Sequence, residues 1–296
     1  MEQNNEVKEQ LEEQTVNVKD TPATTPSSQS RSGTILPTQA GGGGCPTCGS
    51  ATGSNGGVTP SFVYALGRVE ARFPRLAVEK EFVQATGREK TVGLTDREAL
   101  HKVLSQRQNR YLVRQMCWVL TIEGLETYIL VPRDPADVDM LVEALRPSPR
   151  PTDVDVVIGM RGPIAPPEMC NGLMVPIIVF DQMYSFDVDS LIKSIPKPEK
   201  MTAKEFTPAA EELFMRIMQM ADNAGATDDH RALNYLAVRY HAIYAKAAES
   251  LAQNCSLTSV EVRPSALSGT RRIVDVIFTF TNRQTDVTEK FFVRVD

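Results

Sequence analysis

Between residues 62 and 107, apolar and polar positions follow first a strand period and then a helix period. Residues 62–69 alternate well enough to predict a strand, and residues 76–86 predict a short helix that ends at a glycine. Thr95, followed three residues later by Glu98, is typical of a capping box, and the apolar stripe behind it predicts a helix to about residue 107. This part of the chain therefore predicts a strand and two helices.

The middle of the chain predicts a hairpin and then another helix. Residues 111–122 and 125–131 are two strand-like runs on either side of Glu123-Gly124, which favours a turn. Asp134-Pro135 matches the N-cap and first position of a helix. Apolar residues at helical spacing follow that pair, so we expect this helix to bury one face.

Proline is concentrated on both sides of a short predicted strand at residues 154–158. The loop at residues 161–172 contains three of these prolines. Because proline fixes φ, this loop has few conformations to lose on folding, and we expect it to hold its side chains rigidly. Residues 175–180 then predict a buried strand.

The last third of the chain predicts two long helices and three strands. The first helix is predicted to start at Thr207 with Pro208 at its first position, and the second to run from about Asp229 to Gln253. Gly225 separates them, which suits a helical hairpin. Strands are predicted at residues 257–263, 271–281 and 288–295.

Strands and helices are only partly alternated along the chain, which favours the α+β class. We expect a mixed or antiparallel sheet, the long helical hairpin and a C-terminal antiparallel sheet. The first sixty residues differ, because they contain few aliphatic and no aromatic side chains and cannot bury enough apolar area to offset the loss of chain entropy. We therefore interpret residues 1–44 as a disordered acidic and glycine-rich tail, and residues 45–296 as the folded domain.

Charge and hydropathy exclude two classes of partner. The net charge of −5 argues against nucleic acid, whose binding requires clustered Lys and Arg. The longest apolar run, residues 173–180, is far shorter than the roughly 20 residues that cross a bilayer, which argues against a membrane protein. The chain has five cysteines and no secretory signal, so we expect a reducing compartment, the cytoplasm.

The most specific chemical motif is Cys45-Pro46-Thr47-Cys48-Gly49. Two thiolates spaced in this way form a zinc knuckle, which supplies half of a tetrahedral site. We predict a structural zinc site with four thiolates, from Cys45, Cys48, Cys117 and Cys170. Two alternatives stay open: Cys117 as an ordinary buried thiol, and the first pair as a redox motif, which the surrounding glycines disfavour.

Signatures of catalysis are weak. No serine lies in a nucleophile elbow or a protease signature, and no glycine-rich phosphate loop lies between a strand and a helix. The three histidines show no arrangement with a nucleophile. The sequence therefore leans away from an enzyme. If there is catalysis, Cys170 or His101 is the expected participant.

Four stretches of sequence together resemble a known family. They are residues 62–74 (FVYALGRVEARFP), 109–118 (NRYLVRQMCW), 161–172 (RGPIAPPEMCNG) and 281–286 (TNRQTD). The chain from about residue 45 to 296 resembles the domain of unknown function at the C-terminus of cyanobactin maturation proteases of the PatG type. A similar domain ends the PatA-type partner protease. The resemblance implies a place in a pathway that processes ribosomally made precursor peptides, but not proteolysis, because the subtilisin-like catalytic domain lies outside the matching region.

These observations predict a cytoplasmic, non-catalytic accessory module with a structural zinc site. Its partner is a precursor peptide or a partner biosynthetic protein. Two other classes of function compete with this prediction. One is an enzyme that modifies the precursor peptide, and the other is a structural protein that forms homodimers through its C-terminal sheet.

Overall fold

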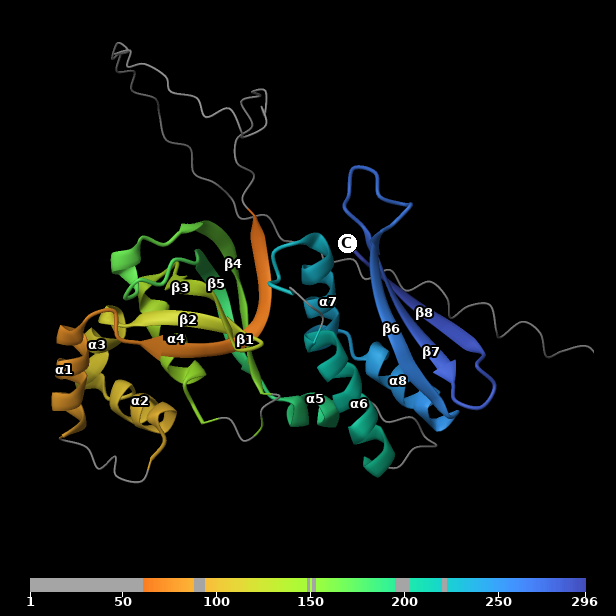
Figure 1. Cartoon of the computed structure of the whole chain (residues 1–296), viewed down its shortest axis with the longest axis horizontal. Coiled ribbons are helices and arrows are strands. Elements are labelled where there is room, and N and C mark those ends of the chain that lie inside the picture. Colours follow the sequence, from red (N-terminus) through yellow and green to blue (C-terminus); the bar gives the residue numbers. More distant parts are fainter. Residues whose placement is uncertain (1–60, 88–93, 148–149, 151–152, 195–202, 220–222) are drawn as a thin grey trace, which may run out of the picture. The chain divides into compact units, whose positions relative to one another are not determined.

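The computed structural model describes residues 61–87, 94–147, 150, 153–194, 203–219 and 223–296. These residues form helices and two separate sheets, which confirms the α+β class (Figure 1). The predicted boundary after residue 44 lies outside the described residues, as do Cys45 and Cys48. No helix in the described ranges is long and apolar enough to cross a bilayer.

The first sheet is a closed barrel of five strands in the order β1-β2-β3-β5-β4 (Figure 1). Its strands are β1 (Phe62–Arg72), β2 (Cys117–Ile122), β3 (Leu125–Pro132), β4 (Val154–Ile164) and β5 (Pro176–Phe186). All neighbours are antiparallel except β3 and β5, which are parallel, so the sheet is mixed as expected. The predicted turn between β2 and β3 is confirmed, because Glu123 and Gly124 both have positive φ, as a tight hairpin requires.

Helices α1 (Leu76–Thr86), α2 (Asp96–Leu104), α3 (Arg110–Gln115) and α4 (Val138–Ala144) share one core with the inside of the barrel. The predicted bounds of α1 are confirmed. The capping box is also confirmed, because the Glu98 side chain accepts a hydrogen bond from the Thr95 backbone N–H at 2.7 Å and the Thr95 hydroxyl accepts one from Glu98 N–H at 3.3 Å. Asp134 caps a short 3₁₀ turn, Pro135–Asp137, that leads into α4.

The prediction of one strand over residues 111–122 is wrong in its first half. Residues 110–115 form α3, and β2 begins at Cys117. Leu112 and Val113 are buried in the helical conformation, and the indole N–H of Trp118 donates to the carbonyl of Val113 at 3.0 Å. The first strand residues therefore complete the hydrogen bonding at the end of the helix.

The C-terminal part combines helices α5 (Val188–Ser194), α6 (Ala203–Met218), α7 (Asp228–Arg239) and α8 (Ala242–Ala252) with the second sheet. That sheet is antiparallel, as predicted, with β7 (Val274–Asn282) between β6 (Cys255–Pro264) and β8 (Thr288–Val295). Val276, Phe278 and Phe280 of β7 are buried against the helices in one large core. We call this cluster the large core. It also includes Leu66, Val154, Val156, Phe206, Leu213, Phe214, Ile217, Leu233, Leu236 and Tyr244.

The predicted pair of long helices needs two corrections. α6 starts at Ala203, so Pro208 lies inside the helix and not at its first position. The second helix is divided into α7 and α8, with Tyr240 in a non-helical conformation. The buried hydroxyl of Tyr244 donates to the carbonyl of Ala237, and this bond takes the place of the helical bond that an unbroken helix would make there.

The segment before α7 lies directly against the barrel. Gly225 has a φ of +69° and accepts a hydrogen bond from the Tyr64 backbone N–H at 3.0 Å. A Cβ at this position would collide with the backbone of Tyr64, so only glycine fits. Asn234 of α7 donates to the Tyr64 carbonyl at 2.8 Å, which fixes the helix to β1.

Candidate functional site

Strand register places four apolar side chains side by side on the outer wall of the barrel. Phe62 pairs with Met160, Met160 with Val179, and Val179 with Val131, so the row crosses β1, β4, β5 and β3. Paired residues point to the same face of a sheet. We call these four residues the apolar row. Phe62 is 54% exposed and the other three are half-buried, and none belongs to a buried cluster of the described residues.

An ion pair borders the apolar row. The guanidinium of Arg133 donates to Asp181 at 3.2 Å and contacts the sulfur of Met160 at 3.1 Å. Arg133 is about half exposed, so its charge stays solvated while its contact with Met160 fixes it beside the row. The surface thus combines apolar side chains with one cation and one anion.

A loop that we call the strap, residues 165–175, covers the neighbouring part of the wall. Ala165 donates to the Val175 carbonyl at 2.9 Å, which closes the base of the strap. Pro167–Met169 form a 3₁₀ turn inside it. Ile164, directly before the strap, and Met174, within it, are about 60% exposed, which adds apolar surface at this end of the barrel.

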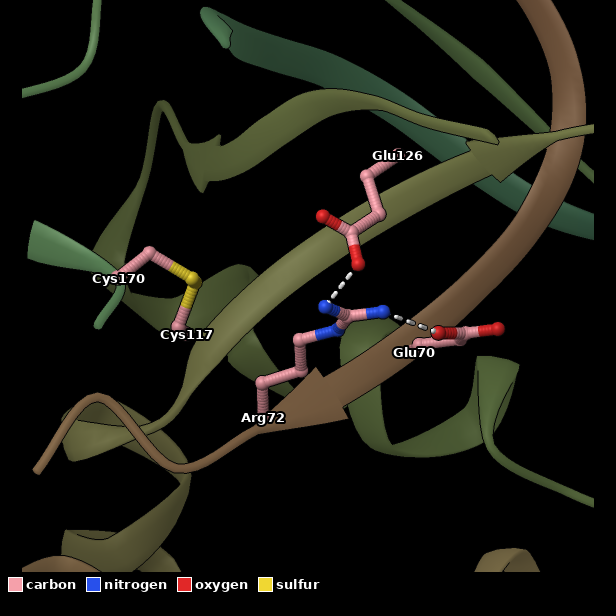
Figure 2. The surroundings of a disulfide bond; sticks show 5 residues. All are labelled: Glu70, Arg72, Cys117, Glu126 and Cys170. Carbon is pink, nitrogen blue, oxygen red and sulfur yellow. Dashed lines mark hydrogen bonds and ion pairs between the residues drawn. A yellow bond between two sulfur atoms is a disulfide. The ribbon is translucent and has the colours of Figure 1, made fainter. Parts of the chain in front are cut away.

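A disulfide joins the strap to the barrel. Cys170 of the strap is bonded to Cys117 at the start of β2, with a Cα–Cα distance of 5.5 Å (Figure 2). Both residues are buried, at 3% and 4% exposure. They belong to a small apolar cluster, the strap cluster, whose buried members are Cys117, Val119, Ile129, Ala165 and Cys170.

Charged side chains lie beside the disulfide. Arg72, which pairs with Cys117 in the β1–β2 register, lies between the carboxylates of Glu70 and Glu126 (Figure 2). Burial alone would lower the pKa of Arg72, but the hydrogen bonds and charges of the two glutamates outweigh burial and raise it. The guanidinium is therefore held as a fixed positive charge near the two sulfurs.

The structure brings together two of the four predicted zinc ligands. Cys117 and Cys170, which lie 53 positions apart in sequence, meet as a covalent pair. Cys45 and Cys48 lie outside the described residues, so the four-thiolate site stays a prediction. Among the residues that the structure describes, no group of three or more His, Cys, Asp and Glu side chains could hold a metal ion. Cys255 is a free, buried cysteine on β6.

His101, the other candidate for catalysis, lies on α2. Burial lowers its pKa, and its charged neighbours are Glu143, Arg146 and Arg97. Val103 and Leu104 of the same helix belong to the core inside the barrel, whereas Cys170 belongs to the strap cluster on the outer wall. The two candidates for catalysis are thus attached to different parts of the fold.

Tyr64 and Tyr184 form a polar contact between aromatic side chains that the sequence did not indicate. The hydroxyls of Tyr64 on β1 and Tyr184 on β5 lie 3.2 Å apart, and the guanidinium of Arg239 lies 5.0 Å from the centre of the Tyr184 ring. Burial raises the pKa of Tyr64, and the hydrogen bond to Tyr184 adds to this effect. Tyr64 packs against the large core, so we interpret this group as part of the packing of α7 on the barrel.

Comparisons with known proteins agree with the resemblance noted in the sequence. Residues 62–263, more than half of the chain, match the family described as the PatG Domain. A solved structure titled "PatG Domain of Unknown Function" superposes with a TM-score of 0.63 and 19% sequence identity, over 79% of this chain and 91% of that chain. At this identity the second comparison shows a shared fold. A search of curated proteins finds no match.

Proposed function

The chain belongs to the PatG domain family, and from that premise we propose that it is a non-catalytic accessory module that binds a peptide or a protein partner. The pathway we propose is the biosynthesis of peptide natural products from ribosomally made, cyanobactin-like precursors, in the cytoplasm. The observation that supports binding is the apolar row, which the register of four strands places on the outer wall of the barrel.

The apolar row has the composition of a small binding surface. Burying the side chain of an exposed Phe or Met on a partner contributes roughly 1.5–3 kcal/mol, and aromatic residues are frequent among the residues that dominate binding energy. Phe62 supplies such an anchor, and Arg133 and Asp181 supply a polar rim. A partner segment with apolar side chains and a charged group at its edge fits this surface.

We further propose that zinc stabilises the module through Cys45, Cys48, Cys117 and Cys170 in their reduced form. What supports this proposal is the spacing of Cys45 and Cys48, which is typical of half a tetrahedral zinc site. Metal analysis of the full-length protein, purified under reducing conditions, tests it: one equivalent of zinc supports the site, and none overturns it.

The alternative of an enzyme that uses Cys170 has less support. The Cys170 sulfur is bonded to Cys117, and a disulfide sulfur has no thiolate with which to attack a substrate. His101 would have to act without it. A modifying enzyme would be recognised by turnover of the peptide, which mass spectrometry detects in the same samples as the binding test.

The binding proposal can be tested with the precursor peptide encoded nearest to the gene, synthesised with a fluorescein label. Fluorescence anisotropy against the full-length protein is expected to give saturable binding, and light scattering to give a complex of one chain with one peptide. Met160→Asp places a charge in the middle of the apolar row and should weaken binding at least tenfold.

Leu267→Asp is the matched control. Leu267 is 60% exposed and lies in the loop between β6 and β7 of the second sheet, away from the apolar row in sequence and in sheet. It should bind like the wild type. If Met160→Asp and Leu267→Asp bind equally well, the apolar row is not the binding surface. If light scattering shows a dimer that the peptide does not alter, the homodimer is the better description.

A further inference from the structure

We propose that the Cys117–Cys170 disulfide is a reversible redox switch that controls how much of the outer barrel wall a ligand can reach. While the bond is intact, the strap is held over the wall next to the apolar row. When the bond is reduced, the strap is free to leave and to uncover more apolar wall. The inference rests on the binding function proposed above and adds how that binding is regulated. It concerns the protein without bound metal.

The strap covers a continuation of the apolar row. Ile129 of β3 pairs with Ile177 of β5, two positions before the pair of Val131 and Val179 that belongs to the row. Side chains two positions apart on a strand point to the same face, at a distance of about 6.6 Å along the strand. Ile129 is buried in the strap cluster and Ile177 packs against it, whereas the two valines lie outside it. The position of the strap therefore decides how far the apolar surface extends.

The disulfide is the main attachment of the strap. The backbone hydrogen bonds of residues 166–174 join strap residues to each other: Met169 to Pro166 at 3.0 Å, Gly172 to Pro167 at 2.7 Å and Leu173 to Cys170 at 2.9 Å. Within the described part of the chain, residues 166–174 make no hydrogen bond or ion pair with the barrel strands. The covalent bond and the apolar contacts of the strap cluster are what hold the strap against the wall.

The apolar contacts of the strap are few. Of the strap residues in contact with this part of the wall, Ala165 and Cys170 are buried, and Met169, Leu173 and Val175 are half-buried. The free energy of an apolar contact is roughly proportional to the area it buries, so half-buried side chains contribute only part of their possible area. A peptide that buries the same wall residues can replace the strap once the covalent bond is open, and cannot do so while the bond is closed.

The proposed compartment suits a reversible bond. Thiols in the cytoplasm are kept reduced, and the disulfides that form there are usually transient or redox-sensing. Cys170 has exposed neighbours in the strap, Glu168 and Asn171, whereas Cys117 begins a stretch of four buried strand residues. A reductant is therefore expected to reach the Cys170 sulfur first.

The reaction balances with two molecules of a low-molecular-weight thiol, such as glutathione. The first glutathione thiolate attacks the Cys170 sulfur, which breaks the bond to Cys117 and forms a mixed disulfide on Cys170. The second attacks the glutathione sulfur of that mixed disulfide, which releases Cys170 and glutathione disulfide. Two electrons pass from glutathione to the cysteine pair. Both cysteines take up a proton, because their burial favours the neutral thiol.

The test compares the oxidised and the reduced full-length protein, both kept free of metal with EDTA. Differential alkylation and mass spectrometry give the state of the pair after equilibration in glutathione buffers. Hydrogen exchange reports on the strap, and fluorescence anisotropy gives the affinity for the fluorescein-labelled precursor peptide. We expect reduction to speed exchange in the strap and to tighten peptide binding by roughly tenfold or more, because two further apolar side chains become available.

Three variants sharpen this test. The double substitution Cys117→Ser and Cys170→Ser leaves the strap unlinked, so it should bind the peptide like the reduced wild type, with or without an oxidant. Ile177→Ser removes an apolar side chain next to the strap and should limit the gain on reduction to less than about threefold. Cys255→Ser removes the free thiol of β6 and should show the same gain as the wild type.

Each outcome bears on the switch alone or on the binding function as well. A pair that stays oxidised in excess reduced glutathione is a permanent link, which overturns the switch. Reduction without faster exchange in the strap overturns it too. If the strap is released but the reduced protein binds the peptide equally or more weakly, the regulation is wrong and the binding function stands. If neither form binds the peptide, the binding function is wrong and this inference falls with it.

Discussion

Two parts of the outer barrel wall are covered in different ways. Where Leu66 and Val156 point outward, helices and the second sheet cover the wall and form the large core. Where Val119 and Ile129 point outward, the strap covers the wall, and the strap cluster has five buried residues, two of them the bonded cysteines. The first part is stabilised by buried area, whereas the second has fewer buried residues and is joined to the barrel by the Cys117–Cys170 disulfide. The following tests are ordered by the size of the expected effect.

The largest loss of stability is expected in the large core. Phe214 of α6 is completely buried and stacks on Phe186 of β5 at 5.6 Å between ring centres. Phe214→Ala should lower the free energy of unfolding by about 3–5 kcal/mol, because it removes apolar burial and leaves a cavity. Urea denaturation followed by circular dichroism measures this. A loss below about 1 kcal/mol would show that the helices contribute little to the barrel.

The next largest effect is expected at the strap. The disulfide closes a loop of 53 positions, and removing it should cost about 2–4 kcal/mol in the oxidised, metal-free protein. The double substitution Cys117→Ala and Cys170→Ala should also raise hydrogen exchange of residues 165–175, measured by mass spectrometry, and leave exchange in α6 unchanged. Cys255→Ala is the control for removal of a buried thiol. Equal exchange in the strap before and after the double substitution would mean that the strap cluster is sufficient without the link.

The third largest effect is expected at Asp155, a buried carboxyl group in the barrel wall, and it depends on pH. Asp155 of β4 is 3% exposed and accepts hydrogen bonds from Val69 N–H at 2.9 Å and the Ser185 hydroxyl at 2.8 Å. Burial raises its pKa above the usual value, although both hydrogen bonds oppose the shift. The folded state thus favours the protonated form, so the contribution of Asp155 to stability is present at low pH and is lost as the pH rises through its folded pKa.

Asp155→Asn should cost about 1–3 kcal/mol near pH 4, because one donor is left without an acceptor, and less near pH 7, where the wild type pays for a buried charge. Urea denaturation of both proteins at pH 4, 5.5 and 7 measures the difference. A penalty that grows with pH would mean that the ionised carboxylate is the stable form in the barrel.

The smallest loss of stability is expected at the apolar row. Phe62 and Tyr64 point outward from the same strand, but Phe62 is 54% exposed, whereas Tyr64 packs against the large core. Phe62→Ala should change the free energy of unfolding by less than about 0.5 kcal/mol, and Tyr64→Ala should cost at least about 2 kcal/mol. Together the two measurements test whether the large core covers the outer wall at Tyr64 but not at Phe62. Equal costs would show that Phe62 is part of the core and not a binding residue.

Local signals predicted the parts of the fold that are determined within a few residues. The capping box of α2 and the Glu123-Gly124 turn each depend on neighbours in sequence, and both are confirmed. Residues 111–115 were predicted as strand because short apolar runs suit either period. In the structure these residues are helical, and the indole N–H of Trp118 donates to the Val113 carbonyl in α3. That contact is visible only in three dimensions.

The candidate site was only partly predictable for a related reason. The sequence predicted that Cys117 and Cys170 converge as thiolate ligands of zinc, because ligands of one ion must meet wherever they lie in the sequence; it did not predict the disulfide that joins them in the structure. The residues of the apolar row share no such chemistry that would mark them as neighbours. Phe62 and Met160 are 98 positions apart, and each looks like an ordinary strand residue. Only the closure of the barrel, which pairs β1 with β4, makes them neighbours.

The closure of the barrel also divides the pairing of its first strand. In β1, residues 62–67 pair with β4 and residues 68–72 pair with β2, so each half of the strand has one strand neighbour. On the other side of the first half, the Tyr64 N–H donates to the Gly225 carbonyl and the Tyr64 carbonyl accepts from Asn234 of α7. At Tyr64, a helix and the segment before it therefore supply the backbone partners that a neighbouring strand supplies elsewhere in the wall.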